Sequence, residues 1–308
     1  MLGLAAAIAC SGKRDEPAAQ GGSAGGSAGS AAPAPPPKPE IELLSPGAEP
    51  RQILRYSLAK NATAHLWLDM TSALDTGDMK TASPPLHVAL DVHVDDVLPD
   101  GRMKLTATIA SLTAEGDGVG IGNGSSSATS QAAAHAGSAG AELVGLAITS
   151  TLSPDGHLTD VRAADRPLPP AEQALVPQLL ADFEPVAMTW PTEPVGVGAT
   201  WRRVLSELHA GPFVLHVDVV NELVARSGSA ALSLAFTSQL RGDDQTVHES
   251  GIELTATHIA GSSSGSGTFD LASFAIDAAW TTTMHMDMKD NVSSTPMTMT
   301  NTIRQRSH

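Results

Sequence analysis

The strongest chemical signal in the sequence is a group of soft side chains near the C-terminus. The group consists of Trp280, Met284, His285, Met286, Met288, Met297 and Met299. Thioether sulfur suits Cu(I), so the group could bind copper. On a β-strand, however, the methionines at 284, 286 and 288 would share one face with Trp280, and the last two would follow on a partner strand. Such a face is typical of a core or of an adaptable surface for an apolar ligand, and we favour these interpretations over a metal site.

A second candidate metal site is a polar face of histidine and aspartate. His87, Asp91, His93 and Asp95 would project together from one strand. Imidazole and carboxylate ligands suit Zn²⁺, provided that three or four of them converge. The same pattern is typical of the solvated face of a half-buried sheet, which is the more common structure. We therefore favour the solvated face and expect no resident cofactor.

Cys10, the only cysteine, follows a short apolar run. Residues 1–10 are too short to span a bilayer and are similar to the end of a signal peptide. Ala7-Ile8-Ala9-Cys10 resembles the bacterial lipobox, in which cleavage leaves an acylated cysteine at the N-terminus. The leucine common three positions before the cysteine is replaced by Ala7, and no Lys or Arg precedes the run. We expect a truncated signal peptide over 1–10 with Cys10 lipidated; the alternative is a free cysteine in an apolar tail.

The next segment, 11–39, is rich in Gly, Ser, Ala and Pro, which bury little apolar surface. It predicts a disordered tether that holds the body of the chain, 40–308, away from a membrane to which the acyl chains on Cys10 attach. Ser11 does not resemble an inner-membrane retention signal, so we expect an outer-membrane lipoprotein of the bacterial cell envelope, facing the periplasm or the cell surface. The net charge of −15 disfavours nucleic acid as a partner.

Hydrophobic alternation predicts that the body is mostly β-strand. Between Leu86 and Asp95, apolar residues alternate with polar ones, which is typical of a half-buried strand. The Asp100-Gly101 pair predicts a turn, and 102–112 predicts the returning strand. Similar alternation predicts strands at 213–219, 231–240, 252–259 and 280–288.

The arrangement of these strands predicts a diffuse duplication. The stretches 90–112 and 215–240 are alike in pattern, and each copy would begin with an aromatic and basic strand, at 54–58 and at 201–205. Leucines and a phenylalanine at helical spacing predict one connecting helix over 169–185. The glycine-rich stretches 116–140 and 261–267 predict loops. We expect a mainly β (α+β) fold, with repeat 1 at 40–168 and repeat 2 at 186–308 in one domain, whose antiparallel strands form a strongly curved sheet or half-open barrel.

The segment from Trp190 to Trp201 carries a resemblance to a known family. Its prolines favour an extended entry, Gly196 and Gly198 permit a tight turn, and Trp201 begins a strand. It resembles uncharacterised, β-rich secreted bacterial lipoproteins that contain Pro-x-x-Pro-Val-Gly-x-Gly-x-x-Trp after a short helix. The turn at 153–158 and the strand at 267–271 also fit that family. The resemblance implies a structural motif and brings no catalytic residues.

Three strings similar to enzyme motifs lack the context that their chemistry needs. Residues 261–265 fit a nucleophile elbow without a following helix, and 57–60 fit a serine-lysine acylase string without its Lys-Thr-Gly companion. Residues 118–124 are glycine-rich without the Lys-Ser/Thr of a phosphate loop. We therefore expect a non-catalytic envelope lipoprotein that binds a lipid or another apolar molecule in a β cavity. The alternatives are a docking module for an envelope protein, and copper or zinc binding.

Overall fold

A computed structural model describes residues 40–114, 142–169, 187–210, 213–228, 230–249, 252–289 and 293–307, together with Gln173, Val176 and Leu180. The described chain is mainly β. Its strands are β1 (Glu40–Ser45), β2 (Thr63–Asp75), β3 (Lys80–Ala82), β4 (Leu86–Val97), β5 (Met103–Ala114), β6 (Ala147–Leu152), β7 (Leu158–Ala163), β8 (Thr200–Ala210), β9 (Phe213–Ser227), β10 (Ala231–Arg241), β11 (Gln245–Glu249), β12 (Ile252–Asp270), β13 (Ile276–Lys289) and β14 (Ser294–Ser307).

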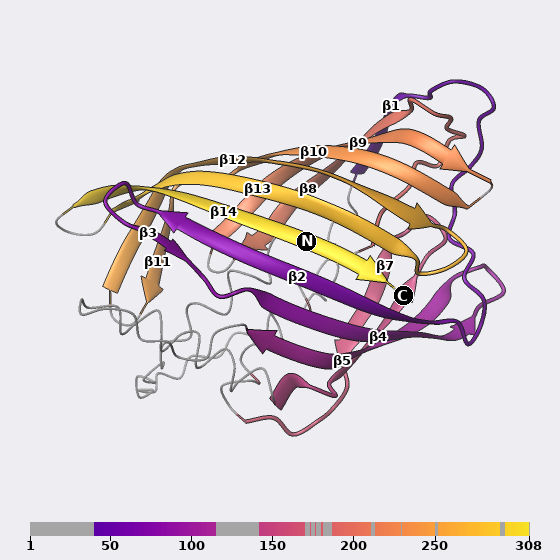
Figure 1. The fold of residues 1–308 in the computed structure, drawn as a ribbon, viewed down its shortest axis with the longest axis horizontal. Helices are drawn as coiled ribbons and strands as arrows, with labels where there is room; N and C mark the ends of the chain where they lie inside the picture. The colour runs from indigo at the N-terminus through magenta and orange to yellow at the C-terminus, as the bar shows by residue number, and fades with distance from the viewer. Residues whose placement is uncertain are drawn as a thin grey trace, which may run out of the picture.

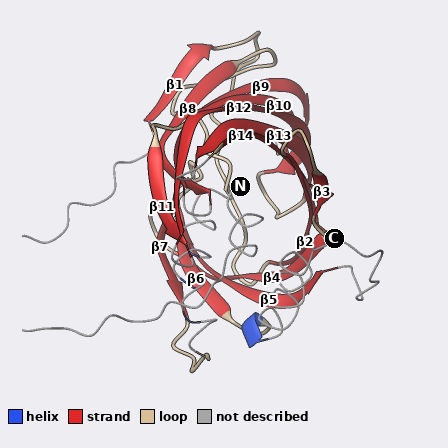
Figure 2. Cartoon of the chain, turned by 90° about the vertical axis from the view of Figure 1, so that its left-hand side faces the viewer, coloured by secondary structure: helices blue, strands red, loops and turns tan. Residues whose placement is uncertain are grey.

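All these strands belong to one antiparallel sheet. Its order is β1-β8-β9-β10-β12-β13-β14-β2-β4-β5-β6-β7, with β11 paired to β12 and β3 paired to β2. The strands bend around an interior, so the sheet has a convex outer face and a concave inner face (Figures 1 and 2). The sheet is not closed into a barrel, because β1 and β7 are its two ends. The mainly β class and the antiparallel architecture agree with the sequence.

Strict alternation explains why the long strands bury one face. In β4 the apolar residues Leu86, Val88, Leu90, Val92 and Val94 are all buried. The intervening polar residues, such as Asp91 and Asp95, are exposed. The turn after β4 forms where Asp100-Gly101 predicts it, with Gly101 at a φ of 83°. Because the period of a strand is two, this pattern places the β4 side chains on a fixed face.

The open side of the sheet is occupied by two extended segments, 46–62 and 187–199. Residues 52 and 195 form an isolated antiparallel bridge. The N–H of Asn61 donates to the carbonyl of Val94 in β4 (2.9 Å), which ties the first segment to the sheet. Gly196 lies so close to the other segment that a Cβ added to it would be 1.7 Å from the carbonyl oxygen of Ala48. The glycine is therefore required by the close approach of the two segments.

The strand predicted at 54–58 is wrong. The N–H of Tyr56 donates to the carbonyl of Pro154 (2.8 Å), whereas the N–H of Ser57 donates to Leu271 (2.8 Å). Because neighbouring amides bond to different parts of the chain, no ladder forms here. The hairpins β4–β5 and β9–β10 do lie in the stretches that suggested a repeat, but their equivalence is not confirmed.

The loop predicted at 261–267 is also wrong, because these residues lie inside the long strand β12. Gly261, Ser263, Gly265 and Gly267 alternate with serines along it, and a Cβ added to Gly265 would be 2.5 Å from the Cβ of Trp280. The inward-facing positions are occupied by glycine and serine, so the alternation of a strand could not be recognised from hydrophobicity. The glycines are present because the neighbouring strand places bulky side chains against them.

The predicted connecting helix over 169–185 lies mostly outside the described residues and stays a prediction. Val176, which is described, packs against the interior of the sheet. The loop predicted at 116–140 lies outside the described residues altogether. Within the described part of the chain, no helix is long and apolar enough to cross a bilayer.

Candidate functional site

The described residues form three buried apolar clusters, of which two follow one another along the central strands and a third contains Leu105, Leu152 and Leu158. The first, here the tryptophan cluster, contains Trp190, Trp201 and Trp280. The rings of the first two are 6.0 Å apart between centroids, and both side chains are completely buried. The second, here the methionine cluster, contains the buried Met284 and Met286. Trp280 and Met284 lie on the same face of β13, so the two clusters follow one another along the concave side.

Two cavities lie inside the curved sheet. Cavity A has a volume of about 100 Å³ and is lined by apolar groups that include Leu66, Val92, Leu105, Leu152, Leu158 and Phe274. Cavity B has a volume of about 110 Å³ and is lined by apolar groups that include Leu205, Val217, Val219, Phe236, Ala278 and Trp280. Both linings contain Ala187, Phe269, Ile276 and Gln305, so the cavities adjoin. Cavities of this size and character accommodate small apolar molecules.

Small residues on β12 make room for two aromatic rings beside cavity B. Ser263 belongs to its lining, and the neighbouring interior position is Gly265. Phe236 and Trp280 lie on either side of this glycine and meet edge to face, with ring centroids 6.2 Å apart. A larger residue at 265 would fill the space that these rings occupy. The sequence therefore builds the interior from large aromatic side chains against a strand of glycine and serine.

A few polar groups face this apolar interior. The side chains of Asn221 and Gln305 are 1% and 2% exposed and belong to the cavity linings. Among the described residues, no hydrogen-bond partner meets Asn221 Oδ1 or Gln305 Oε1. Tyr56 lines cavity A, and burial raises the pKa of its phenol above the usual range. Buried polar groups are normally hydrogen-bonded, and these two amide oxygens belong to residues that line the cavities.

Of the residues predicted to form an apolar ligand surface, only one lines a cavity. Trp280 lines cavity B. The methionines pair across strands, with 284 opposite 299 and 286 opposite 297. All five of them, Met284, Met286, Met288, Met297 and Met299, lie in or against the methionine cluster, outside both cavity linings. Leu208 and Val217 belong to that cluster and also line cavity B, so the methionines are close neighbours of the cavity.

The predicted histidine and aspartate ligands lie on the convex face in separate pairs. His87 Nδ1 is 2.7 Å from Asp69 Oδ1, and His93 Nδ1 is 2.8 Å from Asp95 Oδ1. Asp91 pairs instead with His65 on the neighbouring strand. His285 points outward, with its Nδ1 at 2.9 Å from the hydroxyl of Thr298.

These pairs do not combine into a larger site. Among the described residues, no group of three or more His, Cys, Asp or Glu side chains is placed to hold a metal ion. The hydrogen bond from His87, together with Arg306, keeps the pKa of Asp69 below its usual range. The arrangement fits a solvated polar face better than a metal centre.

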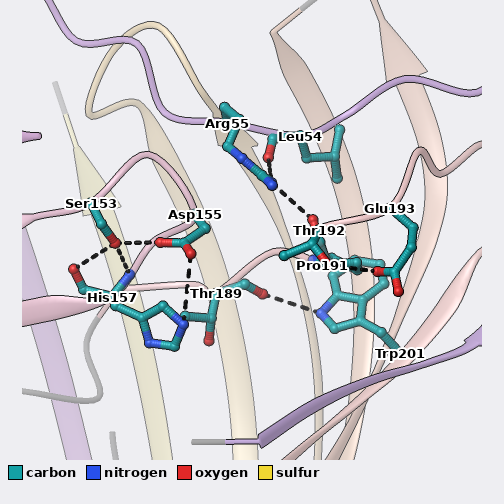
Figure 3. A network of polar contacts seen from close by, with 10 residues as sticks. All are labelled: Leu54, Arg55, Ser153, Asp155, His157, Thr189, Pro191, Thr192, Glu193 and Trp201. Carbon is teal, nitrogen blue, oxygen red and sulfur yellow. Dashed lines mark hydrogen bonds and ion pairs between the residues drawn. The ribbon is translucent and has the colours of Figure 1, made fainter. Parts of the chain in front are cut away.

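A polar network lies where segments 46–62 and 187–199, here the closing segments, meet the turn between β6 and β7 (Figure 3). Ser153, Asp155 and His157 are the residue types of a hydrolytic triad. The hydroxyl of Ser153, however, contacts the carboxylate of Asp155 and accepts a hydrogen bond from the N–H of His157 (3.0 Å). The His157 ring lies 4.0 Å from Asp155 through Nε2. This pattern stabilises the turn and differs from a relay in which a histidine ring activates a serine.

The same network fixes the segment at 187–199. The indole N–H of Trp201 donates to the carbonyl of Thr189 (3.2 Å), and the guanidinium of Arg55 donates to Pro191 (2.8 Å). Gly198 has a φ of 81°, as the turn predicted here requires. The motif from Trp190 to Trp201 thus holds one wall of the interior in place.

Sequence reasoning missed the residues that line the cavities. Asn221 and Gln305 interrupt the apolar alternation of β9 and β14 at inward-facing positions. A polar residue at an inward position was the available signal, but it depends on knowing which face is buried. Cys10 lies outside the described residues, so its lipidation stays a prediction.

The chain was also compared with known proteins. No family model matches it, and a search of curated proteins found no match.

Proposed function

We propose that this chain is a non-catalytic lipoprotein of the bacterial cell envelope that binds a lipid or another apolar molecule inside its curved sheet. The observation that carries the proposal is the pair of adjoining cavities A and B. Their linings are mostly apolar, with a few polar groups at fixed positions. This combination is typical of sites for small apolar ligands. In the proposal, Cys10 carries acyl chains and 11–39 is the tether that lets the body reach its ligand.

Filling cavity B tests the binding site directly. Ala278 is buried and lines the cavity, whereas Ala279, its neighbour on β13, is exposed on the convex face. We expect the neutral fluorescent probe N-phenyl-1-naphthylamine to bind the full chain, and Ala278→Leu to weaken that binding at least fivefold. Ala279→Leu is the matched control and should leave binding unchanged. Equal probe affinity in all three proteins would contradict a binding site in cavity B.

Anchoring is tested separately at Cys10. In a bacterial host we expect the chain to fractionate with membranes and to carry the additional mass of acyl chains on Cys10. Cys10→Ala should move the protein to the soluble fraction without that mass. Membrane association that persists in Cys10→Ala would contradict the lipid anchor while leaving the cavity proposal intact.

A docking module is the second candidate function, and exposed apolar side chains favour it. Leu44, Ile53, Val197 and Val224 are between 44% and 54% exposed. Their segments are joined by backbone hydrogen bonds, including Ala48 N–H to Val197 (2.8 Å) and Gly198 N–H to Leu223 (2.7 Å). Exposed apolar side chains that form one contiguous patch are typical of interaction surfaces. Stable co-purification of a second polypeptide that is lost in Val197→Asp would favour this candidate.

A further inference from the structure

Polar side chains cross the concave face of the sheet in a continuous line. Ser238 lies opposite Ser263, Ser263 opposite Thr282, Thr282 opposite Asn301, and Asn301 opposite Ser72. We call these five residues the polar stripe. On β13 it falls between Trp280 and Met284, so it separates the tryptophan cluster from the methionine cluster.

The polar stripe meets cavity B at one end. Ser238 and Ser263 belong to the lining of that cavity, as do Asn221 and Gln305. At the other end, Ser72 donates its hydroxyl hydrogen to Asn301 Oδ1 (2.6 Å), so the amide oxygen of Asn301 already has a donor within the chain. The contrast is informative, because two buried amides beside the cavity present oxygens that no described group meets.

We propose that Asn221 and Gln305 accept hydrogen bonds from the head group of an uncharged amphipathic ligand, whose hydrocarbon part occupies cavities A and B. This inference rests on the proposed function and adds the chemical class of the ligand. The atoms without a partner are the amide oxygens, which accept hydrogen bonds, so a head group that meets them donates, as an alcohol or an amide does. Leaving such acceptors buried without a donor is costly, which favours a ligand with a donor over a plain hydrocarbon.

One cationic and one anionic side chain line the cavities, and each makes a hydrogen bond with the backbone. Arg203 lines cavity B, and its guanidinium donates to the carbonyl of Ala187 (3.5 Å). Asp270 lines cavity A, and its carboxylate accepts from the N–H of Ala272 (2.7 Å). An anionic head group would lose its hydration and would meet the two amide oxygens, which repel it. The two amide oxygens and the Asp270 carboxylate therefore favour an uncharged donor over an anion.

Three ligands with a ten-carbon chain distinguish a head group that donates hydrogen bonds from one that only accepts them and from an anionic one. Decan-1-ol donates a hydrogen bond, 1-methoxydecane only accepts, and decanoate is an anion. Binding to the full chain is measured by isothermal titration calorimetry. We expect decan-1-ol to bind about tenfold more tightly than 1-methoxydecane, which corresponds to about 1.4 kcal/mol. Decanoate should bind more weakly than the alcohol.

Two substitutions, each by an apolar side chain of similar shape, test whether Asn221 and Gln305 cause the preference for the alcohol over the ether. Asn221→Leu and Gln305→Met remove the acceptors and should reduce the preference for the alcohol to less than threefold, while 1-methoxydecane still binds. Neither should lower the melting temperature much, because each removes a buried acceptor that has no partner. Asn301→Leu is the control: it breaks the bond from Ser72, so it should lower the melting temperature and leave the alcohol preference unchanged.

The possible outcomes distinguish this inference from the function on which it rests. If none of the three ligands binds, the apolar-ligand function fails and the inference fails with it. If the alcohol and the ether bind equally, the function stands and the inference is overturned. Tightest binding of decanoate would also overturn it, in favour of an anionic ligand near Arg203.

Discussion

Tyr56 lies against the interior and is the only tyrosine of the chain, so its ionisation can be followed without interference. Burial raises the pKa of its phenol above the ordinary value of 10.0. Because the folded pKa exceeds the unfolded one, this group's contribution to stability is complete below pH 10 and is lost as the pH rises further. We expect absorbance at 295 nm to stay flat through pH 10 in the folded protein and to titrate near pH 10 in urea. Native-state ionisation near pH 10 would contradict the burial of Tyr56.

Asp69 lies at the centre of the polar face formed by β2 and β4. A hydrogen bond with His87, supported by Arg306, lowers the pKa of its carboxyl. The folded pKa is thus below the unfolded one, so the stabilisation is present above about pH 4 and is lost as the pH falls through the folded pKa. We expect Asp69→Asn to cost about 1 kcal/mol at pH 6 and much less at pH 3. Urea unfolding at both values checks this; a pH-independent difference would count against the interaction.

At the scale of elements, β12 depends on the small size of its inward-facing residues. A Cβ at position 265 would lie 2.5 Å from the Cβ of Trp280 and 2.7 Å from the ring of Phe236. We therefore expect Gly265→Ala to lower the free energy of unfolding by about 1–3 kcal/mol, as overpacking does. Ser264→Ala, on the exposed face of the same strand, is the control and should change stability by less than about 0.5 kcal/mol. Equal effects of the two substitutions would show that β12 is not packed as described.

The same strand shows what the sequence could and could not predict. Strands with apolar alternation, such as β4 and β13, were predictable because burial of one face imposes a period of two. In β12 the alternating residues are glycine and serine, whose small size matters only against Phe236 and Trp280 on neighbouring strands. Segment 54–58 has the pattern of a strand, yet its hydrogen bonds go to two unrelated loops. Tertiary contacts determine the conformation of both β12 and segment 54–58, and the local sequence pattern does not indicate those contacts.

The candidate site was predictable from the sequence only in part. The sequence placed Trp280 and the methionines on one face, and they do share the concave side. It did not indicate Asn221 and Gln305, because their importance depends on where the open side of the sheet is covered. Tyr56, Ala187 and Met188, which belong to segments outside the strands, complete the linings of the two cavities.

At the scale of the whole molecule, one open sheet curves around an apolar interior. The sheet has two ends, and the closing segments lie between them instead of a further strand pair. Apolar walls with a few buried acceptors support the proposal of a site for an apolar molecule inside the sheet.

The most direct test is native mass spectrometry of the full chain after mild purification from bacterial membranes, compared with the same sample after denaturation. We expect an additional non-covalent mass in the native spectrum that disappears on denaturation and belongs to an uncharged lipid with a hydroxyl or amide group. The acyl mass on Cys10 should remain in both spectra. Identical native and denatured masses would contradict the binding of an apolar ligand inside the sheet.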